Sequence, residues 1–281
     1  MTRMPSTYSA DALLALVQQG LQVFDLGRPY VSGMPKSPNH APYTHTLQRR
    51  HGDKVREDGG SAANDLIVLG THVGTHVDAL AHISHRGRLF GGHDAAIEQV
   101  GGRFLRGGAH EVGPWVCRGV LLDVAEARGA ASCPAASPVT PADLDAAASR
   151  QGVEVHPGDV VLVRTGWGHF WDDHDRYVGT ESGVPGPDTE AAQWFVDKGV
   201  RAVGSDTIAF EHIPAGVGHA RLPVHRVLLV EHGINIIETL ALEELARERV
   251  HEFLFVLAPL NLVGATGAPV RPLAVTTCTA A

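Results

Sequence analysis

Short apolar runs alternate with polar, turn-forming stretches along most of the chain. Runs of strand type occupy residues 21–26, 65–69, 116–124, 159–165, 200–204 and 253–259, bounded mainly by glycine, proline or charged residues. Helical patterns occupy residues 9–19, 140–148 and 189–198, and a further helix-like run follows residue 225 and ends at Gly233. Thr140 followed by Pro141 is typical of a helix N-cap with proline in the first turn. Strands alternating with helices predict an α/β fold on a mixed sheet.

The remaining segments are predicted to lack regular structure. Residues 28–43 contain four prolines and read as a long, turn-rich loop. Residues 46–64 are polar and charged and are expected to form a mobile excursion. Small residues with proline at 125–137, and acidic residues with glycine at 171–186, indicate two further loops.

Composition restricts the class of protein. The 281 residues are 44% hydrophobic and 19% charged, which is typical of a globular chain that buries a sizeable core. A net charge of −8 argues against a nucleic-acid surface, and no apolar run approaches the roughly 20 residues of a membrane span. Asp11 interrupts the apolar stretch at the N-terminus, which argues against a secretory signal. Cys117, Cys133 and Cys278 are scattered, so we expect reduced thiols in a cytoplasmic protein.

One stretch concentrates metal-binding chemistry. Residues 70–82 read G-T-H-V-G-T-H-V-D-A-L-A-H and place His72, His76, Asp78 and His82 within eleven residues. Imidazole and carboxylate are ligands that suit zinc, manganese or iron(II). A helix would turn Asp78 away from the first two histidines, whereas an irregular turn at Gly74 could bring all of them together. The alternative is chance clustering, since the chain has 17 histidines.

The same stretch carries a family resemblance. The pattern H-x-G-T-H-x-D-x-x-x-H resembles the signature of the metal-dependent cyclase/hydrolase family, which includes bacterial kynurenine formamidases and isatin hydrolases. Leu80 stands where the formamidases usually have proline, and this form resembles the "putative cyclase" branch. Similar motifs extend the resemblance over residues 25–275. They are matched by Asp25, Leu26, Pro29, Met34 and Pro35, by G-S-D-T at 204–207, by His225, Leu228, Leu229, Gly233, Ile236 and Glu238, and by residues 264–272.

The resemblance implies a fold and a cofactor. The fold is a swivelling β/β/α-type single domain over residues 1–281, with a mixed sheet flanked by helices. The cofactor is one or two divalent ions, Zn²⁺ or Mn²⁺. With two ions, the resemblance implies that Asp78 bridges them, that His72 and His76 hold one, and that His225 and Glu238 hold the other.

Further residues receive roles on the same basis. His82 is the expected general base and acid, because imidazole titrates near neutral pH. The resemblance implies that the loop 28–43 walls the pocket of a small-molecule substrate and that the protein is a homodimer or homotetramer. Phe90 is either an aromatic face at the site or a core residue, and Asp206 either orients a ligand or caps a loop. The candidate substrate-binding residues are Met34, His40, Tyr43, Phe90 and Asp206.

The expected reaction is hydrolysis of an amide, a cyclic amide or a lactone by metal-activated water. Three alternatives stay open. The first is a cyclase or lyase acting on a polyketide. The second is a non-heme iron(II) oxygenase that uses His76-x-Asp78 and His225, although the surplus of His72 and Glu238 argues against it. The third is a non-catalytic metal-binding protein.

Overall fold

The structure is a computed structural model that describes residues 14–15 and 17–277. Most of the helix expected at 9–19 lies outside the described residues, as does Cys278. Among the described residues, no helix combines the length and apolar character that a membrane crossing requires.

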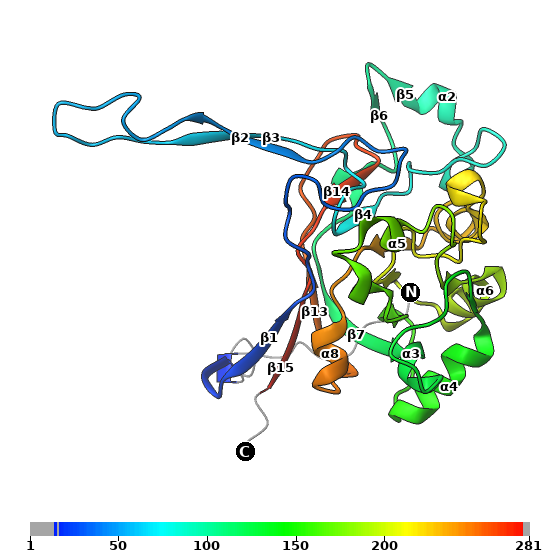
Figure 1. Ribbon diagram of the computed structural model, residues 1–281. Helices are drawn as coiled ribbons and strands as arrows, with labels where there is room; N and C mark the ends of the chain where they lie inside the picture. The colour runs from blue at the N-terminus through cyan, green and yellow to red at the C-terminus, as the bar shows by residue number, and fades with distance from the viewer. Residues whose placement is uncertain (1–13, 16, 278–281) are drawn as a thin grey trace.

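A curled nine-stranded sheet forms the centre of the molecule, in the order β1-β15-β13-β7-β9-β11-β12-β4-β14 (Figure 1). Its four middle strands β7, β9, β11 and β12 run parallel, and the outer pairs are antiparallel. The predicted α/β fold on a mixed sheet is therefore confirmed. The strands are β1 Leu21–Asp25, β4 His76–Asp78, β7 Trp115–Asp123, β9 Val160–Arg164, β11 Ala202–Ser205, β12 Asn235–Glu238, β13 Glu252–Leu257, β14 Gly267–Pro269 and β15 Leu273–Thr277.

Two apolar cores lie on the two faces of this sheet. Helices α4 (Pro141–Gln151) and α6 (Thr189–Lys198) and the π-helix η5 (Arg226–His232) cover one face, whose core includes Leu122, Phe195 and Leu228. The other core gathers Phe24, Leu121 and Phe255 near the short helix α8 (Glu243–Arg247). Both faces of β9 are buried, which explains its continuous apolar sequence.

The predicted helices have the expected ends. Thr140 accepts a hydrogen bond from the backbone of Asp143, and the Asp143 carboxylate bonds back to the backbone of Thr140, so both orphan donors are satisfied. Helix α6 spans the predicted residues 189–198 and begins at the N-cap Asp188.

Two segments expected as loops contain short helices. Helix α3 (Val124–Ala127) begins at the last residue of the predicted strand 116–124 and extends into the stretch read as loop, and α5 (His174–Val178) lies within the acidic segment. In each case an aspartate, Asp123 or Asp173, caps the first turn with its side chain. A single capped turn has no apolar period long enough to be read from sequence.

The remaining short elements are α2 Ala95–Glu98, α7 Pro223–His225, η1 Phe90–Gly92, η2 Ala109–Glu111, η3 Trp167–Phe170, η4 Gly218–Ala220, and the strand pairs β5 Gln99–Val100 with β6 Arg103–Phe104 and β8 Pro138–Val139 with β10 Gly186–Pro187.

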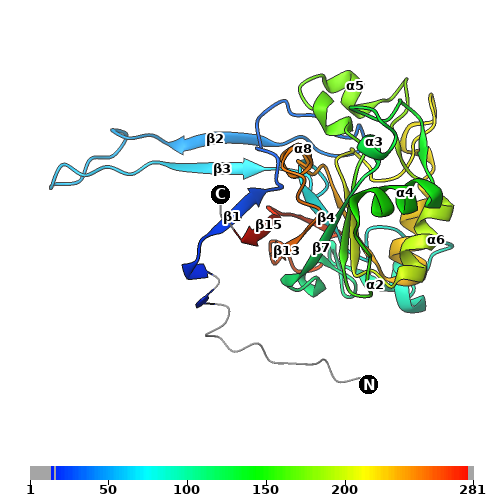
Figure 2. The ribbon, with the colours of Figure 1, turned by 90° about the horizontal axis from the view of Figure 1, so that it is seen from below.

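A two-stranded hairpin projects from the body (Figures 1 and 2). It pairs β2 (Thr44–Arg49) antiparallel with β3 (Asn64–Val68). The prediction of irregular structure from residue 46 was therefore wrong for 46–49, because cross-strand pairing orders a segment whose own sequence shows little apolar alternation. The apolar run at 65–69 is a strand, as predicted, but it belongs to this hairpin and not to the central sheet.

Candidate metal centre

The metal-binding stretch enters the sheet as the short strand β4. Because side chains alternate along a strand, His76 and Asp78 share one face while Val77 points into the opposite core. Strand β12 lies beside β4 with Glu238 directly opposite His76. Residues far apart in sequence thus place an imidazole and two carboxylates on one face. The strand period, and not a helix, produces this grouping, and His72 lies in the irregular turn that precedes β4.

Two glycines make the arrangement sterically feasible. Gly74, immediately before β4, has φ +67°, and a Cβ there would lie 2.8 Å from the Tyr30 ring. The turn expected at Gly74 is therefore present. Gly267 on β14 lies opposite Asp78, and a Cβ on it would be 2.6 Å from Cε1 of His72. The absence of a side chain at Gly267 makes room for the His72 ring.

Two histidines present the same ring nitrogen to the two carboxylates. His76 donates its Nδ1–H to the carbonyl of Gly74 at 2.8 Å, which leaves Nε2 3.4 Å from both Asp78 Oδ1 and Glu238 Oε2. His225, at the end of α7, donates its Nδ1–H to Glu211 Oε1 at 2.7 Å. Its Nε2 lies 3.1 Å from Glu238 Oε1 and 3.5 Å from Asp78 Oδ2. The hydrogen bond at Nδ1 fixes each ring with Nε2 facing the centre.

The electrostatics of the centre favour positive charge. Burial alone would lower the pKa of His76, but the carboxylates of Asp78 and Glu238, each 3.4 Å from Nε2, outweigh it and raise that pKa to about 10. The pKa of His225 is raised well above its ordinary value by Asp78, Glu211 and Glu238, again against the effect of burial. Burial and the charge of Asp78 raise the pKa of Glu238, yet the His225 and His76 rings beside the carboxylate bring it down to about 2. Two ionised, buried carboxylates therefore face each other and require a cation or protons between them.

The donor set fits a divalent cation. His76, Asp78 and Glu238 each offer a ligand atom, and these atoms lie within 4.8 Å of one another; His72, Asp78 and His82 form a second such group. His76 Nε2 and Asp78 Oδ2 are buried and have no hydrogen-bond partner. Polar atoms left unpaired inside a protein are costly, and an ion contacted by both would satisfy them.

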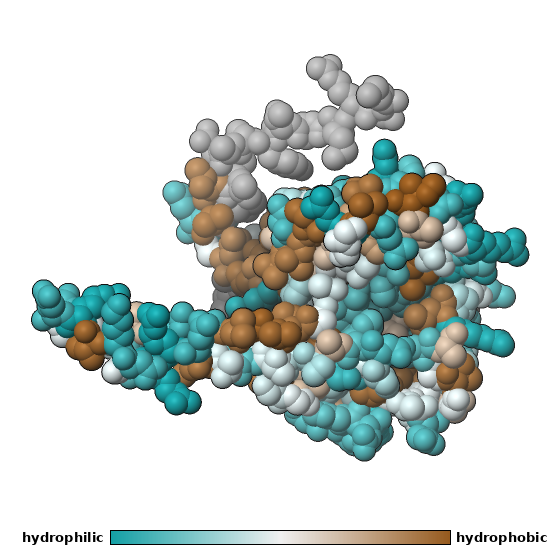
Figure 3. Space-filling view, turned by 90° about the horizontal axis from the view of Figure 1, so that it is seen from above, coloured by the Kyte–Doolittle hydropathy of each residue, from teal (hydrophilic) through white to brown (hydrophobic). Residues whose placement is uncertain are grey.

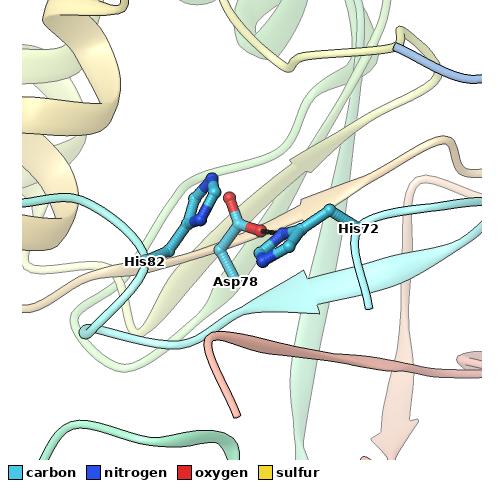
Figure 4. Close-up of side chains that lie close together, drawn as sticks. All are labelled: His72, Asp78 and His82. Carbon is cyan, nitrogen blue, oxygen red and sulfur yellow. Dashed lines mark hydrogen bonds and ion pairs between the residues drawn. The ribbon is translucent and has the colours of Figure 1, made fainter. Parts of the chain in front are cut away.

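His72 and His82 stack beside Asp78 (Figure 4), with ring centroids 3.8 Å apart. His72 donates Nδ1–H to Asp78 Oδ1 at 2.7 Å, and its Nε2 accepts from Thr266 at 2.8 Å. Burial is the main cause that lowers the pKa of His82 to about 3. The half-buried His82 ring is therefore neutral at pH 7, with a pKa below the near-neutral value expected from the sequence.

Asp78 is common to two groups of donor atoms, one with His72 and His82 and the other with His76 and Glu238. The cross-strand register sets His76 opposite Glu238. The ligand pairs that the resemblance implies stay predictions. The ring centroids of His72 and His76 lie 5.1 Å apart, and His225 Nε2 lies 3.1 Å from Glu238 Oε1.

Two loops lie beside the centre. In the proline-rich loop 26–43, the His40 ring stacks on His72 at 5.2 Å and is 6.4 Å from His82, so His40 lies at the site as expected. The second loop precedes α7 and contains His219. The Nδ1 atom of His219 shares a hydrogen bond of 2.7 Å with the Ser37 hydroxyl, and this bond connects the two loops. Burial lowers the pKa of His219, and the charges of Glu238 and Glu211 oppose that effect.

The other four substrate candidates lie apart from these contacts. Met34 is buried and lines a cavity of about 570 Å³ formed with Pro35, Lys36 and residues of α5, but with none of the candidate ligands. The Tyr43 ring packs edge-on against Tyr30 at the base of the hairpin. Phe90 packs against Gly233 at the end of η5 and is partly exposed. Asp206 accepts from the backbone of Thr165 and Gly168, so it caps a loop.

Sequence reasoning missed two residues that position the candidate ligands. Glu211 is 1% exposed and accepts hydrogen bonds from the His225 ring and from the backbone of Val224 and His225. Glu211 belongs to no recognised motif. The only sequence signal near it is the G-S-D-T motif at 204–207, a few residues before it. Thr266 lies in the matched segment 264–272, but its bond to His72 was not predicted.

Several known proteins are similar to this chain over most of its length. A family model described as Putative cyclase matches residues 24–212. The isatin hydrolase of Roseibium aggregatum is 26% identical over 243 residues, covering 84% of each chain. The kynurenine formamidase of Salinibacter ruber is 29% identical over 217 residues, covering 76% of this chain and 81% of that protein. A crystal structure described as a novel cyclase superposes with a TM-score of 0.82 at 28% identity, covering 95% of this chain and 93% of that one.

Proposed function

This chain belongs to the Putative cyclase family, and from that premise we propose that it is a metal-dependent hydrolase of amide, cyclic amide or lactone bonds. The convergence of His76 and His225 on Asp78 and Glu238 is the observation that supports the proposal most strongly. The names of the relatives support the reaction class, since one hydrolyses isatin, a cyclic amide, and another is a formamidase.

The ion would be held by His76, Asp78, His225 and Glu238, with His72 completing the set. The two histidines whose Nδ1–H groups are anchored offer Nε2, and the two carboxylates offer oxygen, a donor set that suits Zn²⁺ or Mn²⁺. When bound, such an ion lowers the pKa of coordinated water toward about 7 and polarises a carbonyl. One ion or two is compatible with a central Asp78, which belongs to both ligand groups.

His82 is the proposed proton carrier. Its ring is neutral, stacks on His72 and lies beside Asp78, so it can take a proton during attack and return it to the leaving group. His40 extends this row of rings and is proposed to contact the substrate. Burial of the ligands excludes bulk water, which strengthens the electrostatic interactions inside the centre.

The direct test is a panel of N-formyl amides, cyclic imides and lactones offered to protein reconstituted with Zn²⁺ or Mn²⁺. We expect hydrolysis of one of these classes, loss of turnover after chelation, and recovery on adding metal back. Turnover that is unchanged in metal-free protein would contradict the proposal. Mass analysis of products distinguishes hydrolysis, which adds one water, from the cyclase or lyase alternative. Oxygen uptake with iron and a keto acid would instead indicate the oxygenase.

The finer predictions drawn from the resemblance keep that status. They are the swivelling β/β/α arrangement, the single domain over 1–281, and the homodimer or homotetramer. The cytoplasmic location stays a prediction from the scattered cysteines.

A further inference from the structure

Two neighbouring cavities lie between the proline-rich loop 26–43 and the segment 174–182, which contains α5. The larger cavity has a volume of about 570 Å³, within the range of small-molecule binding sites. The smaller cavity has a volume of about 80 Å³. Pro38, Val178 and Thr180 line both cavities, so the two adjoin each other. Figures 1 and 2 both show the loop that precedes β2 beside α5.

The smaller cavity reaches the candidate metal centre. Its lining includes Asn39 and His219. Asn39 precedes His40, whose ring stacks on the His72 ring with centroids 5.2 Å apart. His219 lies near the candidate ligands, because burial lowers its pKa and the charge of Glu238 opposes that effect. The smaller cavity therefore lies between the candidate ligands and the larger cavity.

Part of the lining of the larger cavity is apolar. Met34 and Pro35 are buried on the side of the proline-rich loop, and Pro38 and Val178 extend the apolar surface toward the smaller cavity. An apolar chain or ring fits this lining, because its burial there removes both apolar surfaces from water.

The charged residues of the same lining are mainly acidic. Asp175 and Glu181 contribute two exposed carboxylates and Lys36 one ammonium, and His174 is the remaining titratable residue among the described residues that line the cavity. The Lys36 ammonium donates a hydrogen bond to the carbonyl of Ser37 at 3.4 Å. The edge of the body where α5 lies, at the bottom of Figure 3, is covered mainly by hydrophilic residues. The lining therefore repels an anionic ligand group and attracts a cationic one.

The arginine of α5 does not neutralise these carboxylates. Arg176 lies outside the lining of the cavity, and its guanidinium carbon lies 3.4 Å from the centre of the Phe170 ring, in a cation–π contact. The residue next to Asp175 thus directs its positive charge elsewhere, and the lining keeps its negative charge.

We propose that the two cavities hold the tail of the substrate, which is the part remote from the bond that is cleaved, and that this tail is an apolar chain or ring ending in a cationic group. The inference rests on the proposed function, because it assumes that the scissile bond lies at the metal centre. The apolar walls cover the chain, and the carboxylates of Asp175 and Glu181 face the cation. The preferred substrate is then an elongated, amine-bearing amide or lactone and not a compact one.

The first test measures binding and does not depend on turnover. Hexyltrimethylammonium, hexanol and hexanesulfonate share one alkyl chain and differ in charge, and calorimetry gives the Kd of each for the purified protein with and without zinc. We expect the cation to bind most tightly and the anion most weakly, with about two- to fivefold between cation and alcohol, as for exposed charge pairs. Asp175→Asn combined with Glu181→Gln should remove this preference. Asp172→Asn is the matched control, because Asp172 is an exposed carboxylate just before α5 that lies outside the lining.

The second test measures kcat/KM on the reactive group that the substrate panel identifies. A tail of methylene groups ending in an ammonium should raise kcat/KM about fourfold for each methylene that is buried. Thr180→Trp places an indole where the two cavities meet and should lower the ratio of kcat/KM between tailed and compact substrates by more than about tenfold, the loss of roughly two buried methylenes. Asp172→Trp is the control of equal bulk and should keep the ratio. Circular dichroism and melting temperature check that each variant is folded.

The two tests separate this inference from the proposed function. Equal affinity for the three ligands would overturn the inference, and so would a folded Thr180→Trp protein that keeps the wild-type ratio. Hydrolysis of compact substrates with no gain from any tail would also overturn it and would leave the proposed function intact. Binding of the cation as expected, with no hydrolysis of any substrate in the panel, would contradict the proposed function and keep the cavities as a binding site for a cationic chain.

Discussion

Replacing Glu211 tests whether the candidate centre depends on the group that orients its histidine. The Glu211 carboxylate accepts three hydrogen bonds, from His225 Nδ1 at 2.7 Å, from the His225 backbone at 2.9 Å and from the Val224 backbone at 3.1 Å. Glu211→Gln keeps the size of the side chain but turns one acceptor into a donor. The remaining amide oxygen can still accept from the His225 ring but without the charge of the carboxylate, and the Val224 N–H faces a donor, so the anchor that directs Nε2 toward Asp78 and Glu238 is weakened.

The expected magnitude follows from the class of contact. Removing a carboxylate that orients a metal-binding histidine typically weakens metal affinity about 10–100-fold, which corresponds to about 1.4–2.7 kcal/mol. Turnover at saturating metal should change less than affinity does, because every proposed ligand is still present. We expect the apparent Kd for Zn²⁺ to rise by that factor.

The assay is competition with a chromophoric chelator at pH 7, with melting temperature as the readout of folding. Asp206→Asn is the matched control, since Asp206 is fully buried and also accepts backbone hydrogen bonds, but it touches no candidate ligand among the described residues. The control should lower stability and leave metal affinity unchanged. Glu211→Gln protein that is folded and binds metal with wild-type affinity would refute the reasoning.

Three further predictions concern single side chains. His82→Ala should keep its metal and lose about 10²–10⁴ in turnover, because the proposed proton carrier is removed; unchanged kcat would rule out that role. Glu238→Ala should lower metal occupancy measured by elemental analysis, and full occupancy would count against Glu238 as a ligand. Asp143→Asn should destabilise the fold by about 1 kcal/mol at pH 7 after allowance for solvent screening, because the carboxylate bonds Arg128. Burial raises the pKa of Asp143, but the bonds from Arg128 and Thr140 hold it at about 2, against 3.8 for an ordinary aspartate. The stabilisation is therefore complete above about pH 4 and declines as pH falls toward 2. Urea unfolding at pH 7 and pH 3 checks this, and an equal difference at both values would contradict it.

The central part of the site could be predicted from the sequence because its residues lie close together along the chain. His72, His76 and Asp78 lie within one short stretch, and the structure brings His225 and Glu238 to them. The division of the candidate ligands into two groups around Asp78 could not be predicted from the sequence. It depends on the register of β4 against β12, a contact between residues about 160 positions apart.

Other features escaped prediction for related reasons. Residues 46–64 were predicted to be irregular because the order of 46–49 comes from pairing with β3, which composition does not reveal. Glu211 acts on His225 through the fold and belongs to no recognisable motif. The low pKa of His82 arises from burial, which spacing along the chain cannot show.

The most direct measurement of the central claim is anomalous diffraction at the zinc or manganese edge from crystals of reconstituted protein. The account predicts an anomalous peak in contact with His76 Nε2, Asp78 and Glu238, with His225 Nε2 also within ligand distance of the same centre. Reconstituted protein with no peak there, or with its only peak at another part of the surface, would contradict the account.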